Sequence, residues 1–238
     1  REFLAARALL GRLERVAPVL VVPGNHDAQW WKAPFGIGAR DRVHEAWHKV
    51  IGRELEPTLR APGLSIVGMN SAPGVMPWTL TPNPRDLRVK GGVTGAQLAD
   101  AKGRFEASLV DDLRVLVLHH NVVRGKLSNR WGLARPHATL DAIVAMGVDV
   151  VCTGHDHEAR AEVVQRGNGS VLVSTANTLS SRARGKRAAS LNIIEAGSNE
   201  ISVAIWHFDA DARAFSRQVE TRAARSHRSG AVATPRKT

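Results

Sequence analysis

Three clusters of residues in this sequence carry side chains that could bind metal ions. They are Gly-Asn-His-Asp at residues 24–27, His-His-Asn at residues 119–121 and Gly-His-Asp-His at residues 154–157. Neutral imidazoles, amide oxygens and carboxylates are ligands that manganese, iron and zinc all accept. Each cluster alone also fits a plain turn or a structural histidine pair. Together they favour metal-dependent chemistry.

Each cluster directly follows a short apolar run that is typical of a buried strand. These runs are residues 19–22, 115–118 and 148–152. In open α/β sheets, sites form at the carboxyl ends of the strands. We therefore expect the three clusters to lie close together in the folded chain.

Helices are expected between these strands, and β-hairpins after them. Helical patterns cover residues 2–15, 41–51, 94–106 and 139–146, a further strand covers 64–69, and hairpin patterns cover 161–175 and 191–208. Helices that alternate with strands, followed by locally paired strands, predict an α/β protein with a mixed sheet or two packed sheets.

Composition narrows the class of protein. A chain of 238 residues with 43% hydrophobic residues can bury one good-sized core. The single cysteine, Cys152, cannot form an internal disulfide, and no apolar run is long enough to span a bilayer. We therefore expect a cytoplasmic protein that does not enter a membrane. The net charge of +11 favours anionic partners, such as phosphate esters or nucleic acid.

In this order, the three clusters resemble the motifs of the calcineurin-like metallophosphoesterase family. Residues 55–59, 67–71 and 191–194 resemble its cyclic-nucleotide-phosphodiesterase-like branch. Two family motifs, Asp-x-His and Gly-Asp-x-x-Asp, do not occur in the sequence, so we expect a domain truncated at its N-terminus.

The resemblance implies a four-layer α/β/β/α sandwich with two mixed sheets, whose first strands are missing. This phosphoesterase domain is expected over residues 1–208. A basic, disordered tail is expected over residues 209–238.

The resemblance further implies hydrolysis of phosphate mono- or diesters at a site with two metal ions (manganese, iron or zinc). Asn25, His119 and His155 would hold one metal, and His157 would belong to the other. His26 would protonate the leaving group or stabilise the charge that builds on phosphorus. Because the absent motifs would supply further ligands, we expect the activity of this chain to be impaired.

Supporting and substrate-binding roles follow from the same resemblance. Asp27 would orient His26. His120 would support the neighbouring ligand or contact the substrate, which is a small phosphate ester or nucleotide. Arg124 and Arg182 lie in basic runs and would meet the phosphate, although a solvated basic face explains such runs equally well.

Three alternative functions remain open at this stage. His44, Glu45 and His48 fit the zinc-peptidase pattern His-Glu-x-x-His on an expected helix. A nuclease of the same superfamily would use the basic charge to bind DNA, with a steep dependence on salt. A basic binding module without catalysis would use the same charge.

Overall fold

A computed structural model describes residues 2–52, 54–83, 86, 89–179 and 188–225 of the chain. The predicted Arg182 and the last residues of the predicted tail lie outside this part. The described helices are α1 (Glu2–Leu13), α2 (Glu45–Val50), α3 (Gly95–Glu106) and α4 (Pro136–Ala145), with short 3-10 turns at Trp30–Lys32, Pro34–Gly36, Arg40–Arg42 and Pro77–Thr79.

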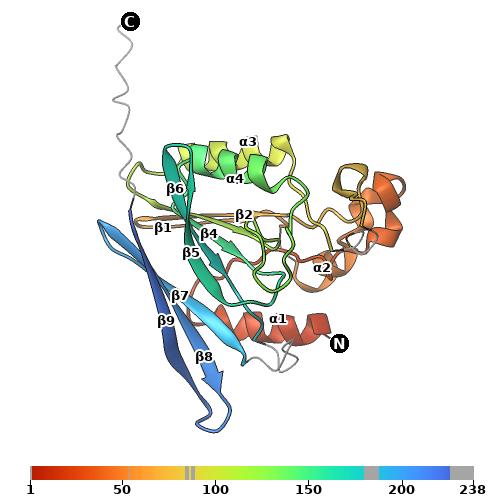
Figure 1. The fold of residues 1–238 in the computed structure, drawn as a ribbon. Coiled ribbons are helices and arrows are strands. Elements are labelled where there is room, and N and C mark those ends of the chain that lie inside the picture. The colour runs from red at the N-terminus through yellow and green to blue at the C-terminus, as the bar shows by residue number, and fades with distance from the viewer. Residues whose placement is uncertain (1, 53, 84–85, 87–88, 180–187, 226–238) are drawn as a thin grey trace, which may run out of the picture.

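A six-stranded mixed sheet forms the centre of the fold (Figure 1). Its strands are β1 (Thr58–Ala61), β2 (Leu64–Met69), β3 (Leu113–Leu118), β4 (Val150–Thr153), β5 (Arg160–Arg166) and β6 (Gly169–Thr175), in the order β1-β2-β3-β4-β6-β5. The four inner strands are parallel, and the outer two pair antiparallel with their neighbours. This arrangement brings the carboxyl ends of β3 and β4 to the same edge.

A second sheet packs under the first and contains β7 (Ser190–Ala196), β8 (Glu200–Asp209) and β9 (Ala214–Ala224). The expected α/β fold with two sheets is confirmed. The second sheet is antiparallel throughout its described strands, whereas a mixed sheet was expected. α1 lies on the same side of the central sheet as the second sheet (Figure 1).

Two apolar cores hold these layers together. Helices α3 and α4 cover one face of the central sheet, where Phe105, Leu116 and Ile143 are completely buried. On the other face, Val150 and Val203 belong to the core between the two sheets. Beside that core lies an apolar cavity of about 600 Å³. No described helix is both long and apolar enough to cross a membrane.

Local signals explain the best-predicted helix. Thr94 accepts a hydrogen bond from the Gln97 N–H, and the Gln97 side chain accepts one from the Thr94 N–H, so the expected capping box opens α3. The described elements include no strand at residues 19–22, where one was expected.

The predicted domain boundary after residue 208 is wrong. β9 continues the second sheet through ten paired positions with β8, from Ala214 to Ala224. Most of its side chains are exposed, apolar Phe215 and Val219 among them, so the segment lacks the apolar alternation that identifies a strand in sequence. Pairing with β8 decides its conformation.

Replacing Phe105 with alanine tests the main core. Phe105 is 0% exposed at the end of α3, so the substitution should lower the free energy of unfolding by about 3–5 kcal/mol. The exposed Leu109, changed to alanine, is the control and should change stability by about 0.5 kcal/mol or less. Urea denaturation measures both, and equal losses would contradict this account of the core.

Candidate metal centre

The site lies where β3 and β4 end. His119 follows β3, and His155 follows β4 after the glycine at position 154. A backbone hydrogen bond of 2.9 Å, from the Gly154 N–H to the His119 carbonyl, carries the contact between the two strands into their loops. Asn25 reaches the same place from the loop at residues 24–27.

Three potential ligand atoms converge at this edge of the sheet. The Asn25 Oδ1 atom is 2.9 Å from His119 Nε2, and His155 Nδ1 is 3.3 Å from the same nitrogen. A side chain at Gly24 would clash with this arrangement, because a Cβ atom there would lie 2.9 Å from His119 Cε1. The structure therefore brings together the residues predicted for one metal.

Burial keeps the His119 imidazole neutral. Burial, with a smaller contribution from the charges of His155, His26 and His157, lowers the pKa of His119 to about 3. Neutral imidazole is the form that binds metal ions. The chemistry of these nitrogen and oxygen donors fits a borderline metal.

The backbone of the third cluster has an unusual conformation. His155 has φ of 70° and His157 has φ of 54°, in the left-handed region that costs energy for residues other than glycine. Such strain gathers at functional sites, where it fixes the direction of a side chain.

A cavity of about 340 Å³ opens over the cluster. It is lined by Asn25, His26, Val89, His119, Ser128, Arg130, His155, Asp156 and His157. All the predicted metal ligands therefore face one cavity, together with the predicted catalytic His26.

Asp27 makes a different contact from the one predicted. Its Oδ2 atom accepts a hydrogen bond of 2.8 Å from the Gly24 N–H, which closes the turn around Asn25 and His26. The pKa of Asp27 is raised overall by burial, and this bond and the charge of His26 offset part of that rise. Asp27 thus fixes the loop that carries His26, and a direct contact with the His26 ring stays a prediction.

His120 supports the cluster from beneath. Its ring is 0% exposed, and its Nδ1 atom is 2.9 Å from Ser71 Oγ. Its imidazole and those of His119 and His155 each have a nitrogen within 4.8 Å of the others. The prediction that His120 contacts the substrate is wrong, because the folded chain buries the ring completely.

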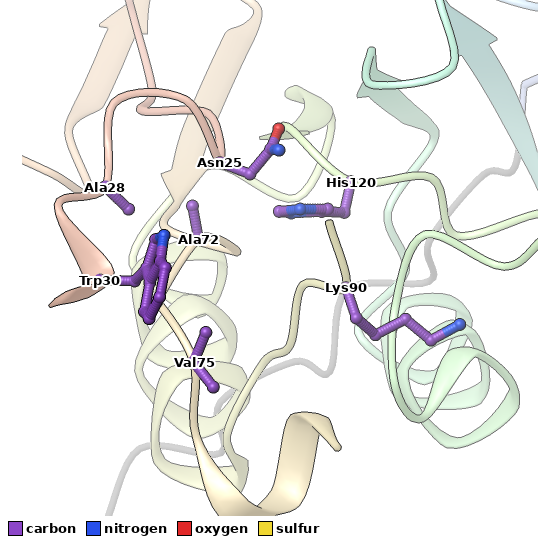
Figure 2. A pocket seen from close by; sticks show the side chains of 8 residues that line it. Asn25, Ala28, Trp30, Ala72, Val75, Lys90 and His120 are labelled. Carbon is purple, nitrogen blue, oxygen red and sulfur yellow. The ribbon is translucent and has the colours of Figure 1, made fainter. Parts of the chain in front are cut away.

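A narrow pocket of about 10 Å³ lies beside Asn25 (Figure 2). That volume is roughly the space of one water molecule. Asn25 and His120 lie on one side of it, and the Trp30 indole lies across from them. The pocket is too small to hold a substrate group, and Trp30 forms its wall opposite Asn25.

Asn121 joins two of the loops, which the sequence did not predict. Its Nδ2 atom donates a short hydrogen bond to the Asp156 carboxylate, which also accepts one of 3.1 Å from Ser128 Oγ. Asp156 stands between His155 and His157 in the chain. The available signal was an amide side chain directly after the His119-His120 pair.

Arg124 does not face the cavity. Its Nε atom donates a hydrogen bond of 2.9 Å to the Asn129 carbonyl, so the side chain is tied to its own loop. Arg130, six residues further along, lines the cavity instead. The prediction of a substrate contact therefore passes from Arg124 to Arg130.

The zinc-peptidase pattern does not form a site. His44 is buried and its Nε2 atom lies 3.2 Å from Asn70 Nδ2, whereas His48 is exposed. Hydrogen bonds from Lys32, Lys49 and Arg42 lower the pKa of Glu45 to about 2, which makes it a poor general base.

Removing a predicted metal-binding side chain should strongly weaken metal binding. We expect His119→Ala and His155→Ala each to lower Mn²⁺ affinity by at least about 100-fold, since loss of a merely supporting residue already costs about 10–100-fold. His137→Ala is the control, because His137 is exposed on α4. Isothermal titration calorimetry measures the affinities, and unchanged binding in both ligand variants would refute the site.

Acid should destabilise the fold, partly through His44. Burial lowers its pKa from 6.5 to about 4, so between these values the unfolded chain binds a proton that the folded chain does not. The free energy of unfolding should therefore fall as pH falls through this window. His44→Gln should make the slope shallower by up to about one proton. Urea titrations across the window measure it, and an unchanged slope would contradict the assignment.

Comparison with known proteins agrees with this geometry. The model of the calcineurin-like phosphoesterase family, Metallophos, matches residues 2–159. No curated protein matches the chain.

Similar solved structures are Vps29 proteins. A single mutant from Entamoeba histolytica has 20% identity and a TM-score of 0.28, with 45% of this chain and 54% of that one covered. Wild-type Vps29 with zinc from the same organism has 14% identity and a TM-score of 0.29, with 72% and 61% covered. Vps29 from Chaetomium thermophilum has 10% identity and a TM-score of 0.31, with 89% and 92% covered.

The match therefore spans about half the length of the first of these structures. The family match covers most of the described chain, including the loops at residues 24–27, 119–121 and 154–157. The chain belongs to the calcineurin-like phosphoesterase family.

Proposed function

We propose that this chain binds a metal ion through Asn25, His119 and His155 and hydrolyses phosphate mono- or diesters at that ion. The observation that carries the proposal is the convergence of three ligand atoms, with Asn25 Oδ1 at 2.9 Å and His155 Nδ1 at 3.3 Å from His119 Nε2. A metal at such a centre supplies polarisation of a phosphoryl oxygen and an activated water.

The protein's own residues would position the substrate and move a proton. His26 lines the cavity beside the ligands, where its imidazole can give a proton to the leaving oxygen. The bond from the Gly24 N–H to Asp27 holds this loop in place. Val89 contributes an apolar side chain to the wall of the same cavity.

His157 lines the cavity as well, and we propose it as a ligand of a second metal. The histidine group that the described residues assemble is His119, His120 and His155. The described part of the chain therefore offers several ligand side chains for one metal ion and a single one, His157, for a second. We expect slow turnover for this reason, and manganese, iron and zinc all suit these donors.

Hydrolysis of bis(4-nitrophenyl) phosphate in the presence of Mn²⁺ tests the proposal. Residues 1–238 should show slow, metal-dependent release of nitrophenol, and a chelator should stop it. His26→Ala should lower kcat by about 10²- to 10⁴-fold and leave Mn²⁺ binding intact, because it removes a proton donor and no ligand. His48→Ala is the control, since His48 is exposed outside the cavity. Equal turnover in the wild type and His26→Ala would exclude this role.

A further inference from the structure

One side chain with a permanent positive charge lines the cavity over the metal ligands. Among the described residues that line it, this is Arg130. The rest of the lining consists of histidines and of neutral or acidic side chains. Among the described residues, the Arg130 guanidinium is the fixed cation that an anionic substrate in this cavity would meet.

Other cations nearby are used to hold the structure. Lys90 Nζ donates a hydrogen bond of 2.7 Å to the Trp131 carbonyl and lies 3.8 Å from the Asp86 carboxylate. Figure 2 shows its ammonium pointing away from Asn25 and His120. Arg160 is 8% exposed and pairs with Glu162 at 3.0 Å. Lys90 and Arg160 keep the loops together, and neither side chain lines the cavity over the predicted metal ligands.

Hydrogen bonds connect the backbone of Arg130 to the loop at residues 154–157. Its N–H donates a hydrogen bond of 3.2 Å to Ser128 Oγ, and its carbonyl accepts one of 2.9 Å from the Gly125 N–H. Ser128 Oγ in turn donates to Asp156 at 3.1 Å. Gly125 packs so closely that a Cβ atom there would lie 1.9 Å from the Asp156 carboxylate. Arg130 therefore keeps its place relative to His155 and His157.

The guanidinium has capacity left for a ligand. Its Nη1 atom lies 3.4 Å from Asp86 Oδ1, a long contact, and the side chain is 42% exposed. Arginine carries five N–H donors in a planar fork that matches two oxygens of a phosphate group. Among the described residues, Asp86 accepts from this side chain through Nη1 alone, which leaves most of the donors available.

We propose that Arg130 binds the phosphate group of the substrate with a bidentate contact, beside the metal held by Asn25, His119 and His155. This inference rests on the proposed function and adds the residue that anchors the anion. The ligand class is a phosphate ester with at least two unesterified or non-bridging oxygens directed at the Arg130 loop.

Calorimetric titration of the Mn²⁺-loaded chain with inorganic phosphate tests the inference. In Arg130→Gln, phosphate affinity should fall by about 10- to 100-fold, the range expected for hydrogen bonds to a charged group, while Mn²⁺ affinity stays unchanged. Arg130→Lys should recover part of the affinity, because it keeps the charge and loses the fork. Arg135→Gln is the matched control, since Arg135 is an exposed arginine just after the same loop.

The possible outcomes separate this inference from the proposed function. Equal phosphate affinity in the wild type and Arg130→Gln overturns the anchor alone. Equal losses in Arg130→Gln and Arg135→Gln show a general effect of charge and also overturn it. A wild-type chain that binds Mn²⁺ but no phosphate overturns both the anchor and the phosphoesterase proposal.

Discussion

The hydrogen bond from the Gly154 N–H to the His119 carbonyl, 2.9 Å long, holds the candidate site together. It extends the parallel pairing of β3 with β4, in which Val117 lies opposite Cys152, beyond the ends of both strands. Parallel neighbours lie about 4.8 Å apart, so ligands that follow them start at a distance that one metal ion can bridge. The helices α3 and α4 and the second sheet matter to the site because they keep these two strands paired and buried.

Burial of a histidine cluster has opposing consequences. It disfavours the charged imidazole, so the nitrogen lone pairs stay available to a metal at neutral pH. The same burial gives up solvation, and the loop adds the cost of two histidines in left-handed backbone conformations, at φ values of 70° and 54°. The apolar cores on the two faces of the central sheet must supply the stability that offsets this cost. A site of this kind needs a fold that is over-determined elsewhere.

Much of the fold was predictable from sequence because several signals agreed. For β3, the apolar run and the histidines that follow it gave both the strand and the site, and for α3 the Thr94 capping box gave its first turn. β9 was missed because its apolar side chains do not alternate along the strand, and only pairing with β8 defines it. The arginines could not be ranked from spacing alone. Whether Arg124 or Arg130 faces the cavity depends on how one loop is hydrogen-bonded to Asp156, and no local pattern encodes that contact.

The indole of Trp30, across the small pocket from Asn25, gives the site an optical property. The chain contains 6 tryptophans and no tyrosine, so its ultraviolet emission comes from indole rings almost alone. Trp30 lies on the loop that follows the Asn25 turn and borders the same pocket as Asn25. A paramagnetic ion beside Asn25 would quench that nearby emission more than the emission of the distant Trp206 in β8. Quenching of Trp30 would then give an optical signal for occupancy of the proposed metal site.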